Sequence, residues 1–251
     1  MFRRFILPLS GLGIAVAAWH VAVASSTGTL IPTPVQAFRG IVELAERGLL
    51  LRYVVASLYR VTWGYLTALL VAVPAGVLLG LWQRGELAVN PMLQLLRPIS
   101  PLAWIPIAIL WFGVGDTAAI FLIFLASVLP LTLTTIHAVH NIEGIHLQAG
   151  RNFGLAHGDL VRAVVLPAIL PQLLVGMRIT LGIAWLVVVA AEMIAVNSGL
   201  GFLIIDARNA GNRYDLVVAG MILIGAVGVL LDLLMRRLEL LPGVRWGYAD
   251  Q

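Results

Sequence analysis

The feature that most constrains this chain is a series of long apolar windows with almost no charge. A helix needs about 20 consecutive apolar residues to cross a lipid bilayer. Windows of about this length cover most of the chain, and they are Phe5–Ala24, Val61–Gln83, Pro98–Gly115, Thr117–Ile142, Leu173–Val196 and Leu216–Leu231. The sequence therefore predicts an all-α membrane protein with about six transmembrane helices, in a single domain over residues 1–251.

The composition supports a lipid environment and excludes several functions. Charged residues make up 11% of the chain, against about 25% in soluble domains. The chain has no Cys, so it forms no disulfide, iron–sulfur cluster or thiolate zinc site. All 16 basic residues are Arg, so the chain lacks the Lys of a Walker A loop. If ATP drives this protein, another chain binds the ATP. The Arg residues are scattered, which argues against nucleic-acid binding.

The distribution of Arg predicts the orientation in the membrane. Six spans place both termini on one side, and more Arg residues fall on that side than on the other. By the positive-inside rule, both termini are expected in the cytoplasm. The first window also resembles a signal peptide, because Ala22-Val23-Ala24 mimics a cleavage site. Its twenty apolar residues exceed the ~7–15 of a signal core, so we favour an uncleaved anchor.

Two segments between the windows carry periodic or turn-forming patterns. On the outer side, Val35–Leu51 has apolar residues at helical spacing with charges between them, which predicts an amphipathic helix at the membrane surface. On the inner side, residues 143–170, here named the knuckle, form the longest polar stretch between spans. The pattern predicts a cytoplasmic helix–turn–helix whose shape suits docking into a partner's cleft. Its turn is expected at Gly154 and Gly158, with Asp159 as the N-cap of a second short helix that ends at Pro167.

The knuckle resembles the coupling loop of ABC importer permeases, which follows the pattern E-A-A-x-x-x-G-x9-I-x-L-P. Gln148-Ala149-Gly150 stand at the E-A-A positions, Gly154 at the fixed Gly, and Leu166-Pro167 at the closing pair. Gln148, Gly150 and Val164 depart from the pattern, which has Glu, Ala and Ile there. Further segments are similar to the nitrate/sulfonate/taurine/bicarbonate group of these permeases: 30–34, 57–61, 96–106, 111–115, 176–179, 190–193 and 199–201.

This resemblance implies a type I importer permease in the bacterial cytoplasmic membrane, forming the pathway for a small oxyanion. Nitrate, bicarbonate and sulfonates such as taurine are the candidates, and we favour nitrate or bicarbonate. The implied partners are cytoplasmic ATPase subunits, a second permease copy in a homodimer, and an extracytoplasmic solute-binding protein. ATP and Mg²⁺ are expected on the ATPase subunits, with no cofactor and no catalytic residue in this chain. The residues expected to couple to the ATPase are Gln148, Ala149, Gly150, Gly154, His157, Gly158, Asp159, Leu166 and Pro167.

Three residues within the windows are candidates for the pathway or its gate. Glu192 is an acid in an apolar run, which marks it either as a pathway group or as a member of a structural ion pair. Trp104 lies between two prolines, where it either lines a cavity or packs in a kinked helix. Arg178 is expected to extend toward the inner membrane surface. The four His residues at 137, 140, 146 and 157 lack the spacing of metal ligands, so no metal site is predicted.

Two alternatives remain open at this stage. The segment Ser198–Asp215 is expected as an outer loop, which either docks a soluble protein or is simply solvated. The alternative function is a secondary transporter or channel that works without ATP. Such a protein needs coupling carboxylates buried at mid-span or broken helices at the midplane, and Glu192 is the main acid available for that role.

Overall fold

The computed structural model describes residues 2–25 and 30–239, and every regular element within them is helical. The elements are α1 (Phe2–Ala24), α2 (Pro34–Glu46), α3 (Leu49–Leu81), α4 (Gln83–Leu96), the 3₁₀ turn η1 (Pro101–Trp104), α5 (Ile105–Phe112), α6 (Asp116–His140), α7 (Gly144–Asn152), α8 (His157–Leu160), the π-helical turn η2 (Val161–Val165), α9 (Leu166–Ala195), α10 (Leu200–Asn209) and α11 (Tyr214–Glu239). The predicted all-α class is confirmed.

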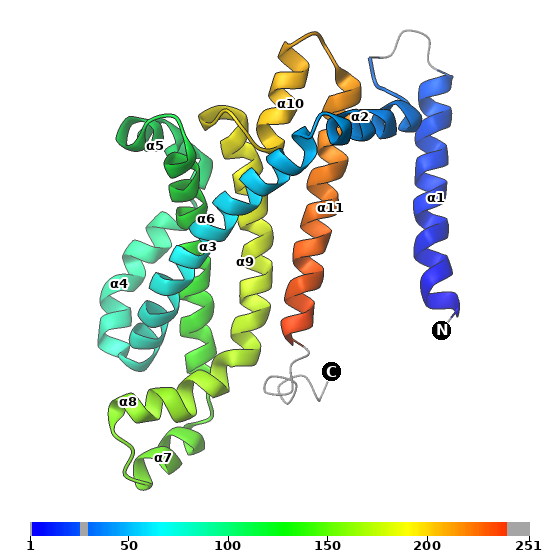
Figure 1. Cartoon of the computed structure of the whole chain (residues 1–251). Helices are drawn as coiled ribbons and strands as arrows, with labels where there is room; N and C mark the ends of the chain where they lie inside the picture. Colours follow the sequence, from blue (N-terminus) through cyan, green and yellow to red (C-terminus); the bar gives the residue numbers. More distant parts are fainter. Residues whose placement is uncertain (1, 26–29, 240–251) are drawn as a thin grey trace.

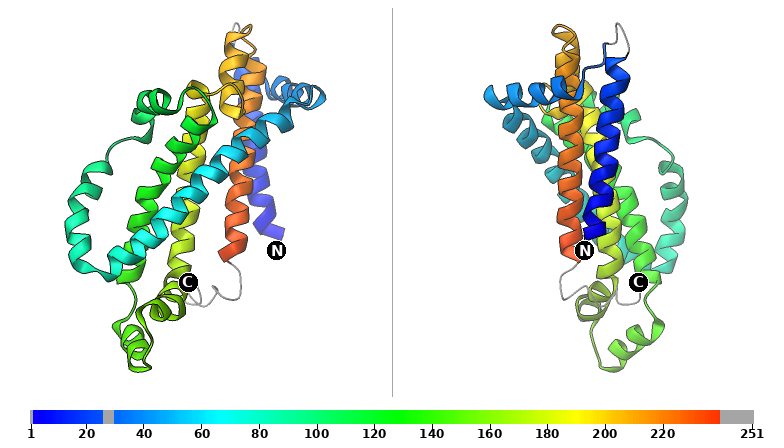
Figure 2. Two further views of the ribbon diagram at one scale, coloured as in Figure 1. Left: turned by 60° about the vertical axis from the view of Figure 1, so that its left-hand side comes forward. Right: turned by 90° about the vertical axis from the view of Figure 1, so that its right-hand side faces the viewer.

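The long helices form an elongated bundle with distinct ends (Figure 1). The helices α7 and α8 project from one end, whereas α2, α5 and α10 lie toward the other. The helix α1 begins, and α11 ends, at the same end as α7 and α8. The two turned views show α4 to one side of α3, α6 and α9 (Figure 2). Almost all described side chains of α1 are exposed, so this helix contributes little to the core.

Four helices are long and apolar enough to cross a membrane: Leu49–Leu81, Asp116–His140, His157–Ala195 and Tyr214–Glu239. A fifth candidate is a bent pair, Gln83–Leu96 with Pro101–Phe112, whose two parts meet at 82°. The described part of α1 contains a shorter apolar helix, Ser10–Ala24. The structure thus supports a multiple-span protein, with four or five candidate spans of sufficient length in the described residues.

The third predicted span differs from the structure. A membrane span was expected over Pro98–Gly115, with a kink around Trp104, but the long helix in this region is α4, and the chain breaks after it. Pro98 and Pro101 lie at the break, where proline removes backbone donors and disfavours a helical residue before it. As a result, η1 leads into α5 near the end of the bundle that carries α2 and α10 (Figure 2).

Two other predicted boundaries also move. The amphipathic helix was expected to run to Leu51, but α2 ends at Glu46 and α3 begins at Leu49. Gly48 lies between them with φ +68°, a conformation that glycine adopts without steric cost and that redirects the chain. Residues 198–215 were expected as a loop, but α10 occupies most of them and buries Leu200, Leu203 and Ala207.

The helix α3 packs closely on α6 through glycines. A Cβ on Gly64 would lie 2.6 Å from Ile123 Cβ, and one on Gly80 would lie 2.8 Å from Val139 Cβ. A Cβ on Gly76 would overlap Thr135. Small residues at these positions let two backbones approach where lipid provides no hydrophobic drive for association. This contact fixes α6, which carries much of the cavity described below.

Candidate functional site

The knuckle forms a helical hairpin that protrudes from the bundle (Figure 1). The helix α7 ends at Asn152, and Gly154 turns the chain with φ +77°. Phe153 stands beside this turn with 85% of its surface exposed. Polar and small residues predicted to contact an ATPase are also exposed: Gln148, Ala149, Gly154, His157, Gly158 and Asp159.

The interior of the knuckle explains one of its small residues. Gly150 is buried, and a Cβ there would lie 2.5 Å from Leu160 Cδ1 and 3.3 Å from Val164 Cγ2. Gly150 therefore allows α7 to pack on the start of the next helix, rather than leaving room for a partner's backbone. The carbonyl of Gly150 also accepts a hydrogen bond from the Leu155 backbone N–H at 3.2 Å, which closes the turn.

Two local predictions for the knuckle are wrong. The N-cap of α8 is Ala156, which makes no side-chain capping bond, whereas Asp159 lies inside the first helical turns. Pro167 does not end the helix, since residues 157–195 form one continuous span. The π-helical turn Val161–Val165 ends two residues before Pro167. A π turn shifts the hydrogen-bond register by one residue and so accommodates a ring that an ordinary α-helix interior excludes. Leu166 and Pro167 are both exposed.

Glu192 lies in a buried polar network near the α10 end of the bundle. Its side chain has no exposed surface, and Arg60 of α3, which is 2% exposed, donates to it at 2.7 Å. The Ser57 hydroxyl and the Gly201 backbone N–H each donate to the Glu192 carboxylate at 2.9 Å. Arg60 also binds Asp116 of α6 at 2.7 Å and the carbonyl of Ser198 at 2.7 Å. The network therefore joins α3, α6, α9 and the turn before α10. The contact between Arg60 and Glu192 is the ion pair expected if Glu192 has a structural role. A role of Glu192 in gating stays a prediction.

Arg178 makes an ion pair instead of extending alone to the inner surface. Its guanidinium lies 2.5 Å from the Asp232 carboxylate and 3.5 Å from that of Glu239, both on α11. Because Arg178 is on α9, these contacts fasten α11 to the bundle. The sequence could not reveal this pairing, since Arg178 and Asp232 are 54 positions apart.

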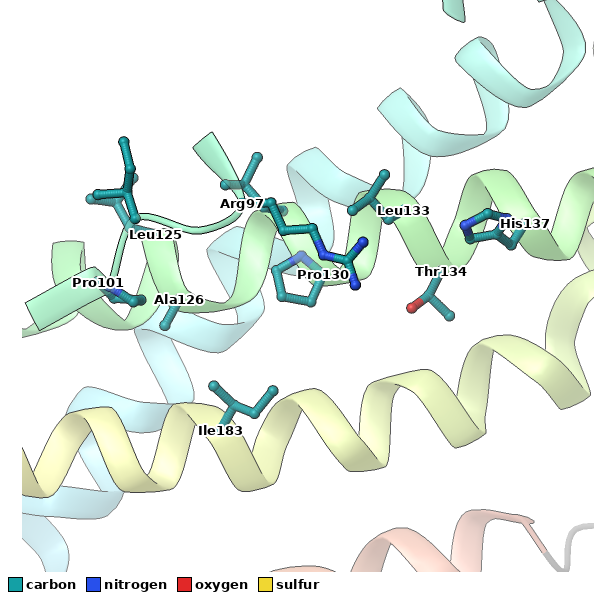
Figure 3. A pocket seen from close by; sticks show the side chains of 11 residues that line it. Arg97, Pro101, Leu125, Ala126, Pro130, Leu133, Thr134, His137 and Ile183 are labelled. Carbon is teal, nitrogen blue, oxygen red and sulfur yellow. The ribbon is translucent and has the colours of Figure 1, made fainter. Parts of the chain in front are cut away.

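Trp104 and the segment around it lie beside a cavity. Trp104 is half-buried and packs against the apolar core. The cavity has a volume of about 480 Å³, and its lining includes the neighbouring Pro101 but not Trp104. The contact of Trp104 with the apolar core supports the interpretation that it packs in a kinked helix. Pathway lining by Trp104 stays a prediction. The side chains that line the cavity come from the α4–η1 break, α6 and α9 (Figure 3).

Several residues of these sites escaped sequence reasoning. Arg60 and Ser57 lie within the apolar part of α3, and the resemblance quoted them only as part of a motif. In the sequence, Arg97 only marks the start of the apolar window Pro98–Gly115. His137 was considered only as a possible metal ligand. Their common signal is a polar side chain inside or beside a span, which marks a site without naming its partner.

Comparison with known proteins gives consistent results. Residues 72–241 match the family model described as "Binding-protein-dependent transport system inner membrane component". A putative ABC transporter permease of Methanocaldococcus jannaschii is 36% identical, over 94% of this chain and 91% of that protein. The taurine transport system permease protein TauC of Escherichia coli is 32% identical, over 94% and 88%. The bicarbonate transport system permease protein CmpB of Synechococcus elongatus is 35% identical, over 90% and 85%.

The fold has a solved counterpart. A chain from the inward-facing MetNI methionine ABC transporter superposes with a TM-score of 0.67 at 21% identity, covering 76% of this chain and 94% of that one. The family match spans more than half of the chain, and the similarity to the named permeases covers most of their length. The chain therefore belongs to the binding-protein-dependent transport system inner membrane components, as a multi-pass permease subunit of an ABC importer.

Proposed function

We propose that this chain forms half of the translocation pathway for a small oxyanion, and that the knuckle couples the pathway to a separate ATPase subunit. The assembly comprises two permease copies, two cytoplasmic ATPase subunits that bind ATP and Mg²⁺, and an extracytoplasmic solute-binding protein. Both chain ends and the knuckle then face the cytoplasm. Relatives named for taurine, aliphatic sulfonates and bicarbonate support an oxyanion as the cargo. Among nitrate, bicarbonate and sulfonates such as taurine, we favour nitrate or bicarbonate.

The single observation that carries the coupling proposal is the exposed side chain of Phe153 at the turn of the knuckle. In the part of the chain that the structure describes, it is the most exposed of the large apolar side chains. It stands beside polar residues of the same hairpin, so lipid is a poor environment for it. An aromatic side chain in this position is suited to a pocket on a soluble partner. The knuckle also leads directly into α9 through a continuous helix, so a push on it is transmitted along a whole span.

The test is reconstitution of this chain with its ATPase and solute-binding subunits in proteoliposomes. We expect ATP-dependent uptake of labelled nitrate or bicarbonate, and no ATP hydrolysis by the purified permease alone. Phe153→Ala removes a side chain whose burial is worth about 1.5–3 kcal/mol, so ATPase binding should weaken by roughly tenfold or more. Leu12→Ala, an exposed apolar residue on α1, is the control and should leave that binding unchanged.

Three outcomes contradict the proposal in different ways. Uptake without ATP indicates the alternative of a secondary transporter or channel. ATP hydrolysis by the permease alone overturns the proposal that a separate subunit binds and hydrolyses ATP. Equal ATPase affinity of the Phe153→Ala variant and the wild type removes the knuckle as the docking element, even if uptake itself is observed.

A further inference from the structure

We propose that the cavity lined by the α4–η1 break, α6 and α9 contains an oxyanion-binding subsite centred on Arg97. In this subsite Arg97 supplies the positive charge, and Thr134 and His137 supply further hydrogen bonds. The inference rests on the proposed function and deepens it, because it places the step at which the pathway itself contacts the oxyanion group.

The cavity lies at middle depth in the bundle. Its lining follows α6 from Leu125 to His137, on either side of the centre of that helix, and includes Ile183 near the middle of α9 (Figure 3). Its volume of about 480 Å³ falls within the ~300–1,000 Å³ of small-molecule sites. A second cavity of about 180 Å³ adjoins it, and both are lined by Arg97, Leu133 and His137. An ion that moves between the two spaces therefore passes Arg97.

Arg97 differs from the two arginines that form ion pairs inside the bundle. Arg60 and Arg178 are each paired with carboxylates, as described above. For Arg97, the described residues supply no carboxylate within ion-pair distance. Its side chain reaches over Pro130 into the cavity (Figure 3). A charged side chain at mid-membrane is costly unless it faces water or a counter-ion. Arg97 is exposed in the structure, so its placement favours a water-filled cavity with an excess of positive charge.

The remaining lining suits an anion. Among the residues that the structure describes, no acidic residue lines the larger cavity. The smaller one includes Glu86, whose carboxylate lies 3.0 Å from His140 Nε2 and so already has a partner. Thr134 lines the larger cavity (Figure 3), and within the described chain no protein group accepts from its hydroxyl. A guanidinium presents paired N–H donors that match the oxygens of a planar or tetrahedral oxyanion.

Because this chain has no cysteine, a single introduced thiol can report the positive potential in the cavity. Thr134→Cys in the assembled transporter is treated with an anionic and a cationic methanethiosulfonate reagent of similar size, in membrane vesicles. The anionic reagent should react faster, and adding Arg97→Gln should lower the anionic-to-cationic rate ratio by about tenfold or more. Nitrate in the buffer should slow the anionic reaction only when Arg97 is present. Ile145→Cys on the exposed knuckle is the control site, and its ratio should not respond to Arg97→Gln.

Uptake provides the second readout. Arg97→Gln should reduce nitrate or bicarbonate uptake by roughly tenfold or more, with the same amount of transporter in the membrane. Arg84→Gln is the matched control, because Arg84 lies on α4, which ends just before Arg97, and is exposed like Arg97 but lines neither cavity. Absence of labelling at Thr134→Cys, or a rate ratio unchanged by Arg97→Gln, overturns the subsite. If the wild type imports no oxyanion, the proposed function fails, and the labelling still decides whether the cavity is a cationic site.

Discussion

The carboxylate of Glu192 and the guanidinium of Arg60 form a buried ion pair at 2.7 Å, although the two residues are 132 positions apart. Each also has partners outside the pair. Ser57 and the Gly201 N–H hold the carboxylate, and Asp116 and Ser198 hold the guanidinium. The helices α3, α6 and α9 and the turn into α10 are thereby joined at one point.

The first prediction concerns removal of one partner from this pair. Arg60→Met leaves the Glu192 carboxylate buried without its counter-charge, which should destabilise the protein by about 3–5 kcal/mol. The double variant Arg60→Met/Glu192→Gln removes both charges and keeps hydrogen-bonding groups for Ser57 and Gly201, so it should lose less than Arg60→Met alone. Thermal unfolding of the detergent-purified transporter measures both. A double variant less stable than Arg60→Met contradicts the ion-pair account.

Glu192→Gln by itself separates the two interpretations of this acid. The amide keeps the size of the side chain but removes the charge. A structural role predicts lower stability, with uptake per assembled transporter unchanged. A gating role predicts altered uptake or ATPase activity at a normal amount of transporter in the membrane, so both quantities have to be measured on the same preparation.

The second prediction concerns pH and the contact between α2 and α11. Glu43 of α2 accepts from Arg213 at 2.6 Å, and this hydrogen bond holds the pKa of the Glu43 carboxyl below its ordinary 4.5. A lowered folded-state pKa contributes stability above pH 4.5, and that contribution is lost as the pH falls through the lowered value. The protection factors of the α2 amides, taken relative to intrinsic exchange at the same pH, should therefore fall below pH 4.5. Glu43→Gln should exchange faster at neutral pH and respond less to acid; an unchanged acid response in that variant would falsify the assignment.

The third prediction uses two glycines of the knuckle as a matched pair. Neither Gly154 nor Gly158 has an atom within 4 Å of a built Cβ, but only Gly154 has a positive φ, at +77°. Gly154→Ala should destabilise the knuckle by about 1–2 kcal/mol through backbone strain. Gly158→Ala should stabilise its helix by about 0.5–1 kcal/mol. Hydrogen exchange over residues 144–166 measures both changes, and equal effects of the two substitutions argue against the turn at Gly154.

The fourth prediction concerns the seam between α3 and α6. Gly76→Ala places a methyl against Thr135 and 2.9 Å from the backbone carbonyl of Thr132, which cannot move without the helix. Overpacking of this kind costs about 1–3 kcal/mol. Gly182→Ala on α9 meets nothing within 4 Å and should be neutral or slightly stabilising. The comparison is made by thermal unfolding, and a Gly76→Ala protein as stable as the wild type excludes a tight seam.

The sequence by itself determined the properties that depend on neighbours along the chain. Apolar windows predicted an all-helical membrane protein, because a helix in lipid must satisfy its own backbone hydrogen bonds. The spacing from Gln148 to Pro167 placed the knuckle, and the family comparisons agree with the resemblance drawn from it. The rules for proline placed helix ends only in part. Pro98 and Pro101 broke a predicted span, whereas Pro167 did not end a helix, because a π turn accommodated it.

Only the tertiary structure decided which distant side chains meet. Nothing in the local pattern links Arg60 to Glu192, or Arg178 to Asp232, since these contacts depend on the order in which the helices pack. The cavity at Arg97 likewise depends on three separate segments, the α4–η1 break, α6 and α9. Periodicity specifies which face of a helix is apolar, but not the helix that this face will meet. The charges inside the bundle acquire their roles only when the helices assemble.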